Sequence, residues 1–253
     1  MNRHVKAAMA AFLLSVPAAA SISVPADATI LKEFEFDVDG VLPSTDAQIS
    51  LDNNTGHAEA SIYSVSGGVL RQRTYAVNGY ASYSYPSTSL TGGGIDPNQS
   101  FSMEARLRIL QIEGSTGAYY QAFAGSYRYR FAFTETGIQL LTDNPGLFYD
   151  IAFDTSEFHT YRLDTTGTGG GFDFYIDGAI AYSGTAYTSS GINGFNFGDG
   201  ITAPGAGADV DWDFVRFSQP AYETAVPEPG ALAVFAVGLL VLATARRGRN
   251  RVA

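Results

Sequence analysis

The 253-residue chain is acidic and contains no cysteine. Between residues 31 and 223, nine Lys and Arg stand against 23 Asp and Glu, so the body carries a net charge of −14 before histidine is counted. Nucleic acid is not an expected partner, because phosphate binding needs clustered cations. Without cysteine there are no disulfides and no thiolate metal site, so stability must come from burial of apolar groups such as the 15 Tyr and 17 Phe.

The first 20 residues predict a secretory signal peptide that is cleaved after about Ala20. A basic start is followed by an apolar segment and by small residues at the cleavage position: Arg3, His4, Lys6, residues 7–16 and Ala18-Ala19-Ala20. A first transmembrane helix is the alternative, but the apolar segment is too short and Pro17 ends it.

Alternation of polar and apolar residues predicts strands throughout the body. In residues 101–109, Phe101, Met103, Ala105, Leu107 and Ile109 share one face, as in a half-buried strand. Further strands are predicted at residues 31–38, 68–75, 80–85, 119–124, 127–134, 137–141, 147–153, 158–164, 172–176, 179–182, 192–197 and 210–217. No body segment has a helical period, so we predict an all-β chain.

Glycine-rich and Asp-Gly turns between these strands favour an antiparallel sandwich. Asp177-Gly178 is the strongest hairpin signal, because its tight turn needs the positive φ that Asp and Gly accept. The glycine-rich residues 167–171 predict a hairpin tip and no phosphate-binding loop, since no Gly-Lys-Ser follows. We predict one domain over residues 28–218 and a linker over residues 219–225.

Several segments of the body resemble a concanavalin A-like or laminin G-like jelly roll. They are HTYRLD at 159–164, FDFYIDG at 172–178, FNFGD at 195–199, DWDFVRF at 211–217 and an early strand SGGVL at 66–70. The resemblance implies two curved antiparallel sheets packed face to face, with ligands on the concave face or the loop rim. Its members include glycan binders, glycosidases and structural modules.

The glycosidase branch of this fold carries Glu-x-Asp-x-x-Glu on one strand, and its nearest counterpart here begins at Glu35-Phe36-Asp37. By the two-residue period Glu33, Glu35, Asp37 and Asp39 share one face, but Gly40 stands where the last glutamate is expected. The segment also begins the domain, where we expect an edge strand. A solvated acidic face is the alternative to a catalytic one, and no catalytic residue is assigned.

Acidic residues near the last strand form a candidate calcium site, since calcium takes six to eight oxygen ligands. They are Asp199, Asp209, Asp211 and Asp213, with Asp37 and Asp39 beside them if the first and last strands pair. Their spacing matches no EF-hand loop, and ordinary turn and strand acids are the alternative. No other cofactor is expected.

Tyrosine-rich strands supply candidate glycan-binding residues, because a phenol ring can stack on a sugar and its hydroxyl can bond to sugar oxygens. The candidates are Tyr119, Tyr120, Tyr127 and Tyr129, and core packing is the alternative for each. Trp212, between Asp211 and Asp213, is expected in the core or at an interface, with sugar binding as the alternative. His57 and His159 form no catalytic or zinc-binding arrangement by sequence.

The last 28 residues combine two prolines, a short apolar run and arginines. Val226-Pro227-Glu228-Pro229-Gly230 precedes a predicted hydrophobic helix at residues 231–245, which Arg246 and Arg247 follow. A 15-residue helix is about 22 Å long, marginal for a bilayer. This order resembles the PEP-CTERM sorting signal over residues 226–253. The resemblance implies an exosortase-type membrane peptidase as partner, an inner-membrane-anchored intermediate, and delivery to the cell surface or an extracellular polysaccharide matrix. An ordinary membrane anchor is the alternative.

The two ends and the body together predict an exported, non-catalytic β-sandwich module that serves adhesion or binds polysaccharide. Two alternatives remain open. One is a glycoside hydrolase of the same fold that uses acids such as Glu35 and Asp37. The other is a purely structural matrix protein.

Overall fold

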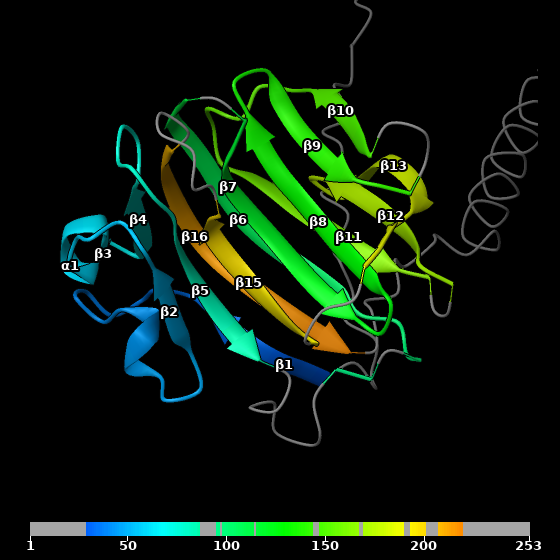
Figure 1. The fold of residues 1–253 in the computed structure, drawn as a ribbon, viewed down its shortest axis with the longest axis horizontal. Helices are drawn as coiled ribbons and strands as arrows, with labels where there is room; N and C mark the ends of the chain where they lie inside the picture. The colour runs from blue at the N-terminus through cyan, green and yellow to red at the C-terminus, as the bar shows by residue number, and fades with distance from the viewer. Residues whose placement is uncertain are drawn as a thin grey trace, which may run out of the picture.

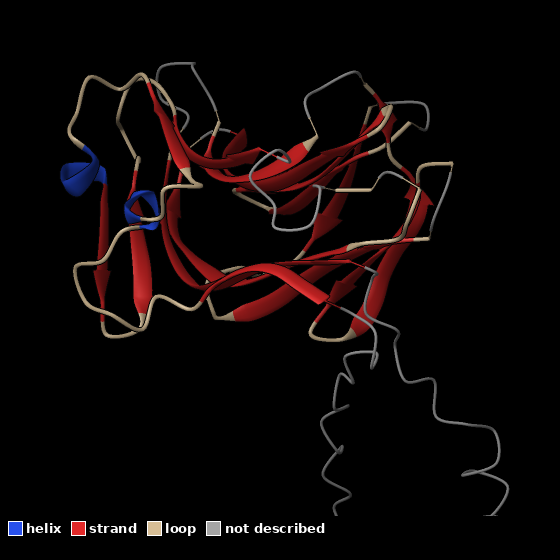
Figure 2. Ribbon diagram, turned by 90° about the horizontal axis from the view of Figure 1, so that it is seen from below, coloured by secondary structure: helices blue, strands red, loops and turns tan. Residues whose placement is uncertain are grey.

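A computed structural model describes residues 29–86, 95–96, 98–113, 115–143, 147–166, 169–189, 193–200 and 207–219. These residues form two eight-stranded antiparallel sheets that lie as two layers (Figures 1 and 2). The predicted concanavalin A-like β-sandwich is confirmed. The predicted signal peptide, linker and C-terminal helix lie outside the described residues.

Sheet A is the rear layer in Figure 1, and its strand order is β13-β12-β11-β6-β16-β4-β3, with β1 paired to β16. Its strands are β1 (Thr29–Phe34), β3 (Tyr63–Ser66), β4 (Val69–Arg73), β6 (Ser102–Ile112), β11 (His159–Thr165), β12 (Gly171–Ile176), β13 (Ala179–Thr185) and β16 (Ala208–Gln219). The first and last strands, β1 and β16, pair with each other.

Sheet B is the front layer in Figure 1, and its strand order is β10-β9-β8-β7-β15-β5-β2, with β14 paired to β8. Its strands are β2 (Ser50–Asn53), β5 (Ala81–Pro86), β7 (Ser115–Ala124), β8 (Tyr127–Thr134), β9 (Gly137–Leu141), β10 (Phe148–Ala152), β14 (Tyr187–Thr188) and β15 (Gly194–Asp199). Two short helices, η1 (Pro43–Thr45) and α1 (Glu59–Ile62), connect strands of the two sheets.

Aromatic side chains from both sheets fill the space between the layers. Trp212 of β16 is fully buried against Phe197 of β15, with ring centroids 5.4 Å apart. Phe217 of β16 stacks on Phe195 of β15, with ring centroids 5.2 Å apart. The indole Nε1 of Trp212 donates to Gln72 Oε1 at 3.2 Å, so its polar atom is satisfied inside the core. The core position predicted for Trp212 is confirmed.

Two local predictions about strands need correction. The segment 66–70 is a hairpin and not one strand, because Gly67 and Gly68 adopt positive φ between β3 and β4. The first strand ends at Phe34, and Phe36 has a φ of 51°, so the alternation expected to continue to Asp39 is broken. The predicted Asp177-Gly178 turn is confirmed, with φ values of 49° and 80° between β12 and β13.

Candidate functional site

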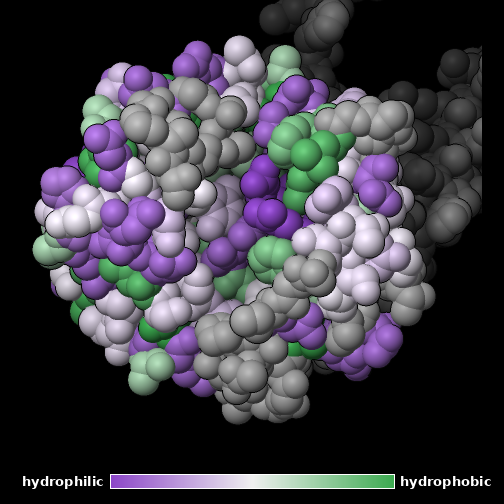
Figure 3. All heavy atoms as spheres, in the orientation of Figure 1, coloured by the Kyte–Doolittle hydropathy of each residue, from purple (hydrophilic) through white to green (hydrophobic). Residues whose placement is uncertain are grey.

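The outer face of sheet B is hollowed. In Figure 2 the upper layer dips towards the middle, and Figure 3 shows strongly hydrophilic atoms at the bottom of the hollow with hydrophobic atoms beside them. Strand alternation places polar residues here: Tyr120 and Phe131 point into the core, so Gln121 and Arg130 point outward. We call this surface the groove and define it by Ser82, Tyr119, Gln121, Phe123, Arg128, Arg130, Phe148 and Asn196.

The register aligns groove residues from four strands across the sheet. Asn196 of β15 pairs with Ser84 of β5 on one side and with Gln121 of β7 on the other. Gln121 in turn pairs with Arg130 of β8. Side chains that pair directly across strands lie about 5 Å apart, so the groove floor holds a continuous polar row.

Two arginines occupy the centre of the groove. Arg128 donates from Nε and Nη2 to Gln121 Oε1, at 2.9 and 2.6 Å, and lies over the Phe123 ring at 5.3 Å. Arg130 lies over the Phe148 ring at 5.5 Å, and its buried Nε has no hydrogen-bond partner among the described residues. Amides and rings thus hold the guanidinium groups, and no carboxylate among the described residues forms an ion pair with either.

Burial governs the protonation of these groups. It lowers the pKa of Arg128 and lowers that of Arg130 to about 10, so both remain cationic at neutral pH. Burial also raises the pKa of Tyr119 to about 12, although Ser82 and the two arginines oppose that rise. The groove therefore presents two cations beside a neutral phenol.

Tyr119 and Asn196 form the second polar part of the groove. Asn196 Nδ2 donates to Tyr119 Oη at 3.1 Å, while the buried Asn196 Oδ1 has no partner within the described part of the chain. A cleft lined by Ser84, Phe123 and Asn196 lies directly beside them. Phenol, amide and guanidinium groups beside aromatic rings can bind hydroxyl-rich or anionic ligands, and Tyr119 can exchange a proton with one.

Of the four tyrosines predicted to bind glycan, only Tyr119 belongs to the groove. Tyr120 and Tyr129 are buried in the core, where Tyr120 Oη donates to the Arg216 carbonyl at 2.7 Å. Tyr127 is partly buried and packs against the same core. Sequence reasoning missed Arg128 and Arg130, although alternation along β8 sets them opposite Tyr127 and Tyr129.

The four aspartates predicted to bind calcium are not gathered into one site. Asp211 pairs with Arg71 and Arg108, and Asp213 pairs with Arg106, on the outer face of sheet A. Asp199 is buried on β15, and Asp209 accepts a hydrogen bond from the backbone of Tyr75 at 3.4 Å. Within the described ranges, no group of three or more His, Asp or Glu side chains could hold a metal ion.

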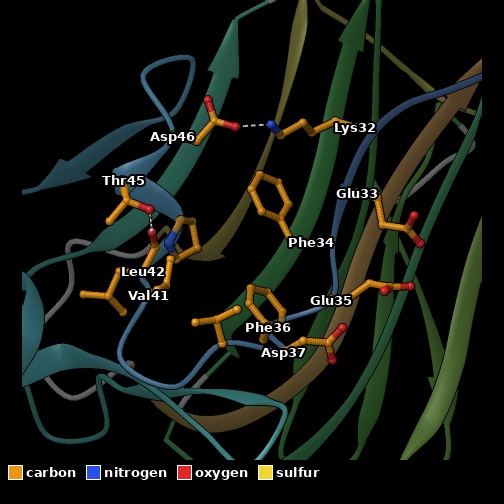
Figure 4. Close-up of a pocket in the computed structure, with 12 residues that line it drawn as sticks. Lys32, Glu33, Phe34, Glu35, Phe36, Asp37, Val41, Leu42, Thr45 and Asp46 are labelled. Carbon is orange, nitrogen blue, oxygen red and sulfur yellow. Dashed lines mark hydrogen bonds and ion pairs between the residues drawn. The ribbon is translucent and has the colours of Figure 1, made fainter.

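The acids considered for catalysis lie on the first strand and just beyond it. Glu33 and Glu35 point to the side opposite Phe34, which lines a cleft beside η1 (Figure 4). Both are bound by Arg216, which also lies 3.5 Å from Glu104. Since β1 belongs to sheet A, these carboxylates lie on the layer opposite the groove.

The groove itself has few carboxylates. Among its described strands, the outward acids are Asp52 on β2 and Asp150 on β10, and these strands form opposite edges of sheet B. With about 4.8 Å between neighbouring strands, the two acids lie well beyond the roughly 5 to 9.5 Å that separates a glycosidase pair. The groove thus offers Tyr119 as its proton-transfer group.

The predicted sorting residues, Val226, Pro227, Glu228, Pro229, Gly230, Arg246 and Arg247, lie outside the described residues. Within the part of the chain that the structure describes, no helix has the length and apolar character needed to cross a membrane.

No protein-family model and no curated protein matches the chain. Solved structures match its fold at low identity. One, from work on endo-acting O-glycanases that initiate mucin breakdown in the human gut microbiota, has a TM-score of 0.53 and 17% identity over 75% of this chain and 98% of that chain. A glycosyl hydrolase family protein from Mycobacterium fortuitum has a TM-score of 0.52 and 17% identity over 75% and 99% of the two chains. An endo-1,3-beta-glucanase from Streptomyces sioyaensis has a TM-score of 0.51 and 15% identity over 78% and 98%.

These matches correct the expectation of a non-catalytic adhesion or binding module. The three structures named above are glycosyl hydrolases by name or come from work on glycan-cleaving enzymes, which favours the glycoside hydrolase alternative over the main prediction. Identity of this size establishes the fold, and a shared fold can carry different chemistry. These matches therefore establish the fold of this chain and not its activity.

Proposed function

We propose that the protein is an enzyme that cleaves polysaccharide and binds its substrate in the groove of sheet B. The observation that carries this proposal is the continuous polar row in the hollow, from Asn196 through Gln121 to Arg130, with Phe123 and Phe148 beside the arginines. Aromatic faces and hydrogen-bonding side chains in a concave surface suit sugar rings and their hydroxyls. The named activities of the similar structures agree with this substrate class.

In this proposal Tyr119 donates its proton to the leaving oxygen as the glycosidic bond breaks, a water molecule adds to the sugar carbon, and the proton released by that water returns to Tyr119. Its hydroxyl is held by Asn196, and burial keeps it protonated at neutral pH, so it can donate to a leaving oxygen. The rings of Phe123 and Phe148 position the polysaccharide, and Gln121 orients Arg128 by accepting two hydrogen bonds. General acid catalysis of this kind contributes about 10² to 10⁴-fold in rate.

The test is depolymerisation by the purified full-length chain. It would be incubated with laminarin, mucin, polygalacturonate and dextran, and the appearance of new chain ends would be measured. We expect cleavage of at least one polymer and a loss of at least about 100-fold in Tyr119→Phe. Tyr182→Phe on sheet A is the matched control and should keep full activity. No cleavage of any polymer, or equal rates in the two variants, would overturn the proposal for this groove.

We also propose that the chain is exported and sorted to the cell surface or matrix through residues 1–20 and 226–253. The support is the sequence order at both ends: a basic start with a short apolar segment, and Pro227-Glu228-Pro229 before an apolar run and arginines. An exosortase-type peptidase is the proposed partner. A reporter fused to residues 226–253 should be retained and processed in a host with that peptidase. Replacement of Pro227, Glu228 and Pro229 by alanine should abolish processing, and unchanged processing would contradict the proposal.

A further inference from the structure

The groove arginines form no ion pair among the described residues, unlike most other cations of the body. Arg73, which is exposed and donates to Ser64, is the other exception. Each of six other cations forms an ion pair with a carboxylate: Lys32, Arg71, Arg106, Arg108, Arg162 and Arg216. Arg128 and Arg130 form none among the described residues, and the buried Nε of Arg130 has no hydrogen-bond partner there. In a body of net charge −14, this absence is not explained by a shortage of acids.

Holding these two guanidinium groups in the hollow opposes folding. Burial is the largest cause of the lowered pKa of each, and the charge of Arg128 further lowers the pKa of Arg130. Residues i and i+2 of a strand lie roughly 7 Å apart, close enough for repulsion in a partly buried site. An anion between them would offset both effects, because opposite charge favours the cationic form.

The surroundings of the arginines favour an extended, sugar-like anion. Phe123 and Phe148 flank the two guanidinium groups, and Gln121 and Asn196 continue the polar row to one side. The Asn196 Oδ1 atom and the Arg130 Nε atom are both buried and have no partner among the described residues, which leaves one acceptor and one donor of the row unused there. A charged sugar unit carries both an anionic group for the arginines and hydroxyl groups for the amides.

We propose that the polysaccharide bound in the groove is anionic, with Arg128 and Arg130 contacting carboxylate or sulfate groups on its sugars. This inference rests on the proposed function for the location of the substrate, and it adds the chemical class. Arg128 donates two hydrogen bonds to Gln121, whereas Nε of Arg130 has no partner in the part of the chain that the structure describes. Arg130 is therefore the stronger determinant of charge recognition.

The test is binding of three probes to the full-length protein. Polygalacturonate carries carboxylates, dextran sulfate carries sulfates, and dextran is neutral. We expect one or both charged polymers to bind, with dextran at least about tenfold weaker, and the affinity to fall as salt screens the arginines. Equal binding of all three, or binding unaffected by salt, would overturn the inference. Whichever charged polymer binds more tightly identifies the anionic group as carboxylate or sulfate.

Variants assign the effect to the groove. Arg130→Gln should weaken binding of the charged polymer by about tenfold or more, the size expected for one charge-assisted contact, and Arg128→Gln somewhat less. Arg130→Lys keeps the charge and should recover part of the loss, which a merely structural defect would not. Arg73→Gln makes the same change of net charge at an exposed position of sheet A, where Arg73 contacts Ser64, and should bind normally. Equal losses in Arg73→Gln and Arg130→Gln would contradict the inference.

The two proposals can fail separately. Charge-dependent binding through Arg130 without cleavage of any polymer would support the anionic ligand and overturn the enzyme. Cleavage of neutral laminarin at an equal rate by the Arg128→Gln and Arg130→Gln variants would support the enzyme and overturn the anionic substrate.

Discussion

The outer faces of the two sheets hold arginines in opposite ways. On sheet A, Asp211 is 2% exposed and joins Arg71 and Arg108, and Arg106 pairs with Asp213. On sheet B, Arg128 and Arg130 are held by an amide and by aromatic rings. Asp211 and Asp213 of sheet A therefore pair with arginines, whereas no described carboxylate pairs with Arg128 or Arg130 of sheet B. This difference agrees with the proposed role of the groove as a ligand-binding surface.

The largest expected effect is on sheet A. Asp211→Asn should lower the free energy of unfolding by about 3 kcal/mol, because it leaves two arginines around a buried uncharged amide. Urea unfolding would measure the change. Asp213→Asn is the control, since that partly exposed pair contributes at most about 1 kcal/mol. Equal losses of unfolding free energy in the two variants would show that the buried Asp211 cluster contributes no more than the partly exposed Asp213 pair.

Alkaline pH should reveal the burial of Tyr119. Its folded pKa of about 12 exceeds the ordinary value of 10.0, so the folded state retains a proton that the unfolded state has released. Stability should therefore fall as pH rises from 10 to 12, by on the order of 2 kcal/mol for this residue. Comparing wild type with Tyr119→Phe in chemical denaturation isolates the effect. If the two curves ran parallel through this range, the arginines and not burial would control the phenol.

A smaller effect of opposite sign is expected at the groove arginine. Arg130→Met should leave stability unchanged or raise it by up to about 1 kcal/mol, because it removes a buried cation that has no anionic partner among the described residues. The same substitution at Arg108 should destabilise, since it removes one of the two cations bound to Asp211. Thermal unfolding of both variants would measure the contrast. A clear loss of stability in Arg130→Met would mean that this arginine is structural.

Calcium should have the smallest effect. Asp211 and Asp213 are bound by arginines, and the described residues contain no metal-binding group, so millimolar calcium should leave the melting temperature as it is in chelator. A rise of several degrees in the melting temperature would support the calcium site predicted from the sequence. It would contradict the interpretation that the acids of sheet A are neutralised by arginines.

Strand periodicity was enough to predict most of the sandwich. The inward set from Phe101 to Ile109 is buried as predicted, because alternation in a long strand is a local property of the sequence. β2, β3 and the two-residue β14 were missed, since short strands carry little periodic signal. The acidic alternation from Glu33 to Asp39 failed at Phe36, where the backbone leaves the strand.

The site was predicted less well than the fold, because it depends on which strands become neighbours. The four candidate tyrosines are equivalent in the sequence pattern. The strand register places only one of them, Tyr119, on the outer face of sheet B, in the groove; Tyr120, Tyr127 and Tyr129 face the core. Alternation alone could have singled out Arg128 and Arg130 as the outward residues of β8. That they lack carboxylate partners could not be foreseen, because it depends on the positions of acids far away in the sequence.

The position of β16 within sheet A, between β6 and β4, determines when that sheet can form during synthesis. β16 is the last of the described strands, yet it pairs with β1, β4 and β6. These three earlier strands therefore cannot complete their hydrogen bonding before β16 is present. A chain that emerges from its amino end first cannot complete sheet A until residue 219 has appeared. Such long-range pairing makes folding slow. We therefore expect sheet A to remain incomplete until β16 has been synthesised.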